Sequence, residues 1–130
     1  MDNTFYMKNF YFLLLLFLAS CGGATSESKS NDTILPVEEY AKAIKTDTTA
    51  FIIDVRTPEE YAEGHIDGAV LMNVMDDEAF VAGVDTLSKE HTYYIYCRSG
   101  RRSRKAAGQM IAKGLTVVDL QGGYNAWKGR

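Results

Sequence analysis

The sequence predicts an α/β fold with a central, mainly parallel β-sheet and helices on both faces. Short, continuous apolar runs, which are typical of parallel strands covered on both sides, alternate along the chain with segments of helical periodicity. At residues 51–60 a strand pattern passes directly into a helix start. Such alternation favours crossover connections within one sheet, whose ligands bind beyond the carboxyl ends of the strands.

Each element is expected from its residue pattern. Strands are expected where β-branched and aromatic residues cluster, at residues 51–55, 70–72, 92–96 and 116–120. Helices are expected where apolar side chains recur at helical spacing, at residues 36–45, 77–87, 103–113 and 123–128. A further helix is expected after the first strand, because Thr57 is a good N-cap, Pro58 suits the first helical position and Glu60 suits the first turn.

Length and composition indicate one compact domain. The chain has 130 residues, and about one hundred remain after an amino-terminal leader and linker, a common size for a single domain. The formal net charge is −3, and the basic cluster in the sequence is short, which argues against nucleic-acid binding. We expect a monomer without a nucleic-acid partner.

The amino-terminal segment predicts export. Residues 10–19 form an unbroken apolar run that is too short for a membrane span of about 20 residues and suits the core of a secretory signal. Met7 precedes this run and is an alternative start to Met1. The run ends in Leu-Ala-Ser-Cys at residues 18–21, which resembles the lipobox of bacterial lipoproteins.

This resemblance implies cleavage before Cys21. Residues 1–20 are then a lipoprotein signal peptide, Cys21 carries the lipid, and residues 21–33 form a flexible tether rich in Gly, Ser and Thr. The protein is then lipid-anchored to a membrane of the bacterial cell envelope and faces the periplasm or the cell exterior. The alternative is an ordinary secreted signal in which Cys21 is incidental.

Cys97 stands at the junction of a predicted strand and a predicted helix. Unpaired N–H groups and the dipole at a helix start favour negative charge, so the pKa of this thiol is expected below its free value of about 8.5. Three nearby arginines, Arg98, Arg101 and Arg102, repel one another unless an anion or thiolate lies between them. The alternative is a small buried thiol beside a solvated basic surface.

The cysteine count supports a chemical role for this thiol. If Cys21 carries lipid, Cys97 has no disulfide partner in the chain. A thiolate in an oxidising compartment is prone to oxidation. Such a thiol needs a reducing protein partner or a stable persulfide.

The run at residues 96–103 resembles the active-site loop of the rhodanese-like sulfurtransferases. Three further segments resemble the same family, at residues 54–61, 64–69 and 120–127. The similarity extends over residues 34–130, which we expect to form one rhodanese-like domain. The fold that the resemblance implies is a small α/β domain with a mainly parallel sheet and helices on both faces.

The activity that the resemblance implies is sulfane-sulfur transfer through a persulfide on Cys97. Its thiolate would attack the outer sulfur of an anionic donor, thiosulfate or a persulfide, and a thiol or cyanide would accept the sulfur. The cradle that the resemblance implies for the persulfide is Arg98, Ser99, Gly100, Arg101, Arg102 and Ser103. Asp54 and Arg56 match positions that support the pocket, and neither a metal nor a cofactor is implied.

Several residues outside the loop have expected structural roles. Glu60 is expected to reach back toward Arg56, four residues earlier in the chain. The setting of His65 resembles a structural turn of the family, so a hydrogen-bonded scaffold role is expected for it in preference to general-base catalysis. Residues 122–123 are expected to form a turn, and Trp127 is expected to anchor the core.

Two other functions are open from the residues. A cysteine-dependent phosphatase uses a similar loop, but its signature has five residues between cysteine and arginine, whereas Arg102 closes a loop one residue shorter. Neither Asp54 nor Asp119 is convincingly placed as its general acid. A non-catalytic tethered binding or redox-sensing module is the second alternative.

Overall fold

The computed structural model describes residues 30–130. The expected signal peptide, Cys21 and the first part of the expected tether lie outside the described residues. The strands are β1 (Asp32–Leu35), β2 (Ala50–Asp54), β3 (Val70–Leu71), β4 (Thr92–Tyr96) and β5 (Thr116–Leu120). The helices are α1 (Val37–Thr46), α2 (Pro58–Glu63), α3 (Asp77–Asp85), α4 (Arg101–Ala112) and α5 (Gly123–Lys128).

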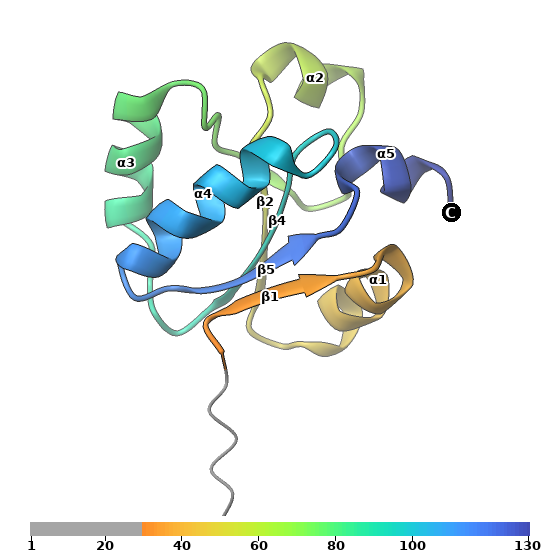
Figure 1. The fold of residues 1–130 in the computed structure, drawn as a ribbon, viewed down its shortest axis with the longest axis horizontal. Helices are drawn as coiled ribbons and strands as arrows, with labels where there is room; N and C mark the ends of the chain where they lie inside the picture. The colour runs from red at the N-terminus through yellow and green to blue at the C-terminus, as the bar shows by residue number, and fades with distance from the viewer. Residues whose placement is uncertain (1–29) are drawn as a thin grey trace, which may run out of the picture.

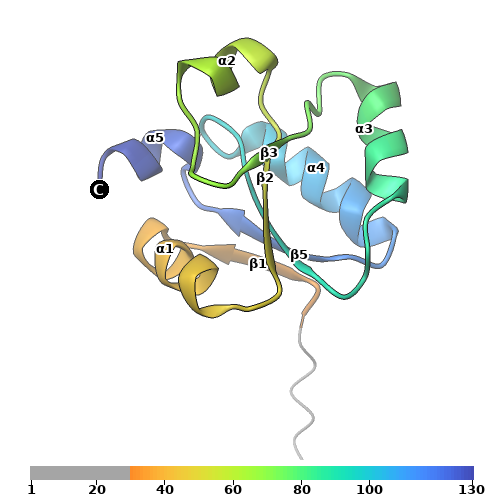
Figure 2. The same ribbon diagram turned by 180° about the vertical axis from the view of Figure 1, so that it is seen from behind.

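These strands form one sheet in the order β1-β5-β4-β2-β3, and every neighbouring pair is parallel. Figure 1 shows the sheet between two groups of helices, and Figure 2 shows the same arrangement from behind. The predicted fold class is therefore confirmed. The four predicted strands and the predicted helices are also present, with ends that differ from the expected ones by no more than two residues.

Strand β1 was not predicted. It pairs with β5, and Asp32 lies opposite Val117 in the register. The ordered sheet thus begins two residues before the domain start expected at residue 34, inside the segment assigned to the tether. The sequence lacks the usual signal here because β1 is an edge strand, half exposed along its length, with Ile34 51% exposed. An edge strand of this kind has no continuous apolar run.

Two apolar clusters cover the two faces of the sheet. On one face, side chains of α3 and α4 pack on β2, β4 and β5, with Phe80 and Met110 almost completely buried. On the other face, α1 and α5 pack on the same strands, with Tyr40 at the centre and Trp127 partly buried against it. Trp127 packs against this cluster as expected. Burial on both faces explains why β4, the middle strand, is buried at every position.

The carboxyl ends of β2 and β4 lie side by side because the strands are parallel and in register, with Asp54 opposite Tyr96. Helix α2 follows β2, and its start is the predicted one. Thr57 accepts a hydrogen bond from the N–H of Glu60, and Glu60 accepts one from the N–H of Thr57, which completes a capping box. The sheet thereby brings Asp54, the start of α2 and the residue after Tyr96 to one edge.

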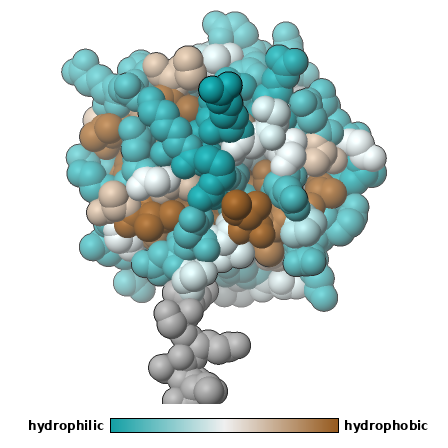
Figure 3. Space-filling model, viewed as in Figure 1, coloured by the Kyte–Doolittle hydropathy of each residue, from teal (hydrophilic) through white to brown (hydrophobic). Residues whose placement is uncertain are grey.

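One face of the domain is mainly polar. On the face shown in Figure 3, hydrophilic side chains cover most of the surface and apolar ones form small separate patches. Within residues 30–130, no helix combines the length and the apolar character that crossing a membrane requires.

Candidate active site

The segment between β4 and α4 bends around the sulfur of Cys97. Gly100 is the N-cap of α4 and has a φ of +107°, a left-handed conformation that glycine adopts without steric strain. This turn directs the N–H of Gly100 at the sulfur of Cys97, 3.0 Å away. Helix α4 therefore begins at Arg101, two residues before the predicted start.

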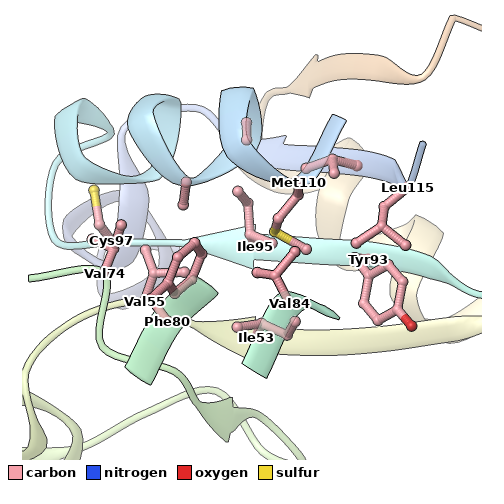
Figure 4. Close-up of a cluster of buried hydrophobic side chains, with 13 residues drawn as sticks. Ile53, Val55, Val74, Phe80, Val84, Tyr93, Ile95, Cys97, Met110 and Leu115 are labelled. Carbon is pink, nitrogen blue, oxygen red and sulfur yellow. The ribbon is translucent and has the colours of Figure 1, made fainter. Parts of the chain in front are cut away.

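The thiol of Cys97 also contacts the hydroxyl of Ser103, in the first turn of α4. The sulfur lies 3.5 Å from Ser103 Oγ, and this hydroxyl donates to the carbonyl of Gly100 at 3.1 Å. Figure 4 shows Cys97 at one end of the buried cluster, with its sulfur directed toward the start of α4. Because Cys97 is only 1% exposed, a substrate has to enter the loop to reach the sulfur.

The surroundings of Cys97 favour its thiolate. Burial raises the pKa of the thiol, but hydrogen bonds with Ser103 and with the N–H groups of Gly100 and Ser99 together lower it by more. The pKa of Cys97 therefore lies below its ordinary value. A lower pKa increases the fraction of nucleophilic thiolate at neutral pH.

Arg102 braces the loop through Glu60 of α2. The two terminal nitrogens of Arg102 donate to the two carboxylate oxygens of Glu60 at 2.7 and 2.8 Å. This ion pair lowers the pKa of Glu60 to about 2. The expectation that Glu60 pairs with Arg56 is therefore wrong, because the carboxylate reaches across to the loop and leaves Arg56 to its neighbour Asp54.

Asp54 and Arg56 form a buried ion pair at the end of β2. Their side chains are 0% and 4% exposed, and Arg56 donates to both carboxylate oxygens of Asp54, the shortest contact being 2.6 Å. Arg56 also donates to the carbonyl of Gly64 at 2.7 Å and lies over the ring of Tyr124, 4.3 Å from its centroid. A buried arginine paired in this way fixes the neighbouring elements in place.

A cavity of about 410 Å³ lies beside the loop. Its lining comes from the connection between β2 and α2, from α2, from the loop and from α5. The lining residues are Arg56, Glu60, Glu63, Arg98, Tyr124, Asn125 and Lys128. Cys97 itself does not line the cavity. Arg98 and Lys128 are exposed cations at its rim. Ser99 of the loop and Arg101, the first residue of α4, are exposed as well. This side of the site therefore attracts anions.

The first residues of helix α5 hold the loop through backbone hydrogen bonds. The N–H groups of Tyr124 and Asn125 donate to the carbonyls of Cys97 and Arg98 at 2.7 and 3.0 Å. Gly123 lies so close to the loop that a Cβ atom there would be 2.6 Å from the carbonyl oxygen of Cys97. The turn expected at residues 122–123 is present, and it is also the platform on which the loop lies.

His65 has a structural position, as expected. Its Nδ1 lies 2.9 Å from the carbonyl oxygen of Tyr61, and its ring stacks on the Tyr61 ring with 3.7 Å between centroids. Within residues 30–130, no group of three or more His, Cys, Asp or Glu side chains is arranged to hold a metal ion.

Asp119 is a residue near the site to which the sequence assigned no role. It is 1% exposed on β5, and its Oδ2 accepts a hydrogen bond from Arg104 of α4 at 3.1 Å. Burial raises the pKa of Asp119, and the neighbouring Ser103 and Arg104 oppose this rise. An aspartate inside an otherwise apolar strand is the available signal, because carboxylates are rarely buried without a specific reason.

Known proteins resemble this chain in sequence and in fold. Residues 36–130 match the family model described as a rhodanese-like domain. The Bacillus subtilis protein YtwF, which has a provisional sulfurtransferase name, is 37% identical over 86 residues, 66% of this chain and 81% of YtwF. The thiosulfate sulfurtransferase GlpE of Stutzerimonas stutzeri is 31% identical over 91 residues, 69% of this chain and 80% of that protein.

A solved structure gives the same result. The crystal structure of a rhodanese-like domain protein from Staphylococcus aureus superposes with a TM-score of 0.65 and 30% identity, covering 73% of this chain and 90% of that chain. The match of the family model covers nearly the whole described domain. The chain therefore belongs to the family of rhodanese-like domain proteins.

Proposed function

We propose that the protein is a sulfurtransferase that carries sulfane sulfur as a persulfide on Cys97. The observation that carries this proposal is the N–H of Gly100 directed at the sulfur of Cys97 from the start of α4. A backbone donor and a helix start both stabilise an anionic sulfur. The names of relatives such as the thiosulfate sulfurtransferase of Stutzerimonas stutzeri support the same reaction class.

In the first step, the Cys97 thiolate attacks the outer sulfur of thiosulfate. A new S–S bond forms between Cys97 and this sulfur, and the S–S bond of thiosulfate breaks. Sulfite leaves with the electron pair of the broken bond. The enzyme then holds Cys97–S–S⁻, and the step needs no external oxidant or reductant.

In the second step, a thiolate or cyanide attacks the outer sulfur of the persulfide. The acceptor leaves as a persulfide or as thiocyanate, and the electron pair of the broken S–S bond returns to Cys97 as its thiolate. A thiol acceptor can be a small molecule or a reducing protein partner. While Cys97 carries the persulfide, its own sulfur is not a free thiolate and is protected from irreversible oxidation.

The loop residues divide into two roles in this reaction. The N–H groups of Ser99 and Gly100 and the hydroxyl of Ser103 stabilise the anionic sulfur. The exposed Arg98 and Arg101 attract an anionic donor to the loop. Arg102 keeps the loop in place through Glu60, and Asp54 with Arg56 supports its edge.

A phosphatase reaction is less well supported. Both terminal nitrogens of Arg102 bind Glu60, so this guanidinium is not available to a phosphate group. Asp54 is completely buried against Arg56 and cannot serve as the general acid for a leaving group. We expect no hydrolysis of an aryl phosphate at a rate above that of the Cys97→Ser variant.

The test is to incubate the full-length protein with thiosulfate and to measure its intact mass and its Cys97 peptide. We expect one added sulfur atom at Cys97, release of sulfite, and thiocyanate after addition of cyanide. The Cys97→Ser variant should gain no sulfur, and Cys21→Ser is the matched control that keeps the reaction. An unmodified Cys97 peptide, or one that carries only a mixed disulfide, would contradict the proposal and favour a redox-sensing module.

We also propose that the domain is anchored to a membrane of the bacterial cell envelope through lipid on Cys21. The support is the Leu-Ala-Ser-Cys sequence at residues 18–21 after an apolar run. The test is fractionation of cells that produce the full chain or Cys21→Ala. The full chain should sediment with membranes, and a Cys21→Ala protein that stays fully membrane-bound would rule out lipidation at this position.

A further inference from the structure

The cavity beside the active-site loop has three charged side chains that form no salt bridge within residues 30–130. They are the carboxylate of Glu63 and the two rim cations, Arg98 and Lys128. All three are exposed, so a ligand can reach them from solvent. The cavity volume of about 410 Å³ lies within the range of about 300 to 1,000 Å³ that is usual for small-molecule sites. The proposed sulfur chemistry gives Glu63 and Lys128 no role.

The other two charged groups that line the cavity are already neutralised. Arg56 binds Asp54, and Glu60 binds Arg102. A ligand in the cavity therefore meets two unpaired positive charges and one unpaired negative charge, which is a net charge of +1. Such a site is complementary to a ligand that has both signs of charge and a net charge of −1.

The three unpaired groups come from three different parts of the fold. Glu63 is the last residue of α2, Arg98 belongs to the loop, and Lys128 is the last residue of α5. Figures 1 and 2 both show these parts as neighbours at one end of the domain. The Nζ atom of Lys128 lies 5.4 Å from the ring centroid of Tyr124, another lining residue, and this contact keeps the cation at the cavity. The groups do not pair with one another, so a ligand can bind both signs of charge at once.

We propose that this cavity binds the thiol acceptor of the sulfur transfer, a small peptide thiol with one ammonium group and two carboxylates. Glu63 binds the ammonium group, and Arg98 and Lys128 bind the carboxylates. Neutral thiols and thiols with a single charge leave part of the site unpaired and bind less tightly. The inference rests on the proposed function and names the class of acceptor that this function uses.

A ligand in the cavity lies beside the persulfide, because Arg98 directly follows Cys97 in the chain. Cys97 is only 1% exposed and does not line the cavity, so the acceptor thiol has to extend into the loop from the charged anchors. The acceptor thiol loses its proton to water, and its thiolate attacks the outer sulfur of the persulfide. A new S–S bond forms to the acceptor, the bond to Cys97 breaks, and its electron pair stays on Cys97 as the thiolate.

Binding can be tested without sulfur transfer. The full-length Cys97→Ser protein is titrated with γ-glutamyl-S-methylcysteine, a thioether that has the proposed charges and cannot accept sulfur, and calorimetry measures the dissociation constant. We expect Glu63→Gln and Lys128→Gln, each added to Cys97→Ser, to weaken binding by about fivefold. Glu59→Gln is the matched control, because Glu59 is an exposed residue of α2 that does not line the cavity. It should leave the dissociation constant unchanged.

Two modified probes identify which charge each residue binds. The N-acetyl form of the probe has no ammonium group, so Glu63→Gln should not weaken its binding further. The dimethyl ester has no carboxylate, so Lys128→Gln should not weaken its binding further. Each residue and its probe form a double-mutant cycle, and a residue with a merely structural role would weaken both forms of the probe equally.

Turnover connects this binding to the reaction. With γ-glutamylcysteine as acceptor and Cys97 present, Glu63→Gln and Lys128→Gln should each raise KM by about fivefold and leave kcat nearly unchanged. Weaker probe binding with an unchanged KM would overturn the role of the cavity as the acceptor site. Equal probe affinity with and without Glu63→Gln, or an equal loss for the probe and its N-acetyl form, would overturn the charge assignment.

The outcomes also separate this inference from the proposed function. Probe binding with the expected charge preferences, in a protein whose Cys97 gains no sulfur from thiosulfate, would contradict the sulfurtransferase proposal and support the ligand assignment. Sulfur on Cys97 without probe binding would support the sulfurtransferase proposal and overturn the inference about its acceptor. Far-ultraviolet circular dichroism of each variant verifies that the fold is kept.

Discussion

Glu60 and Arg102 form a bidentate ion pair that joins helix α2 to the first turn of α4, directly after the active-site loop, with N–O distances of 2.7 and 2.8 Å. The side chains are only 22% and 25% exposed. The same carboxylate accepts the N–H of Thr57 and completes the capping box of α2. One side chain therefore stabilises both a helix start and the loop that carries Cys97.

The first prediction concerns the energy of this pair. Replacing Glu60 by Gln and Arg102 by Gln, singly and together, should give a coupling free energy of unfolding of about 1 to 2 kcal/mol, because the pair is bidentate and partly buried. Urea unfolding of the four proteins measures this energy. Glu59→Gln, an exposed residue of the same helical turn, is the matched control and should change stability little. Additive effects of the two substitutions would contradict a direct interaction.

The second prediction concerns pH. The pKa of Glu60 is lowered by Arg102 from 4.5 to about 2. A carboxyl with a lowered pKa stabilises the fold fully above its unfolded pKa, and this stabilisation is lost as pH falls toward the folded pKa. The difference in unfolding free energy between the unaltered protein and Glu60→Gln should therefore be constant above pH 4.5 and shrink toward about pH 2.

Urea unfolding of both proteins at several pH values across this range provides the measurement. Gln does not titrate, so it serves as the reference at every pH. A difference that stays the same down to about pH 2, or that grows in acid, would mean that Glu60 is not held ionised by Arg102.

The third prediction concerns access of an anionic donor. Arg98 and Arg101 are exposed beside the loop and are not needed to hold it, so Arg98→Gln with Arg101→Gln should raise KM for thiosulfate several-fold and leave kcat nearly unchanged. The rise should shrink at high salt, because screening weakens the attraction in the unaltered protein. Lys105→Gln, an exposed cation further along α4 that binds Asp77, is the matched control. A fall in kcat with constant KM would place these arginines in the chemical step instead.

Local patterns were sufficient to predict most of the fold. Buried parallel strands such as 92–96 have continuous apolar runs, and the start of α2 has a cap, a proline and an acidic residue within four positions. Strand β1 was missed because an exposed edge strand needs only pairing with β5, and pairing leaves no apolar run in the sequence. The loop itself was predictable because its residues are contiguous.

The rest of the site depends on contacts between distant segments. Glu60 binds Arg102, which lies 42 positions later in the chain. The sequence had instead suggested Arg56, four residues before Glu60, as its partner. Asp119 meets Arg104 only because β5 pairs with β4 and α4 packs against both strands. Helical spacing and motif resemblance contain no information on such pairs, which arise from the packing of whole elements.

The last prediction concerns the platform under the loop. Gly123 has a φ of +61°, and a Cβ atom there would lie 2.6 Å from the carbonyl oxygen of Cys97 and 2.7 Å from the backbone of Arg98. Because both contacts are with backbone atoms, Gly123→Ala has to displace the loop. We expect destabilisation of about 3 kcal/mol and a fall of at least about tenfold in the rate of persulfide formation.

Gly108→Ala is the matched control, because Gly108 lies in α4 with open space around it. An added Cβ there should stabilise the helix by about 0.5 to 1 kcal/mol. Thermal unfolding and the rate of sulfur loading measure the two effects, and a fully active Gly123→Ala protein would show that the loop does not depend on this contact.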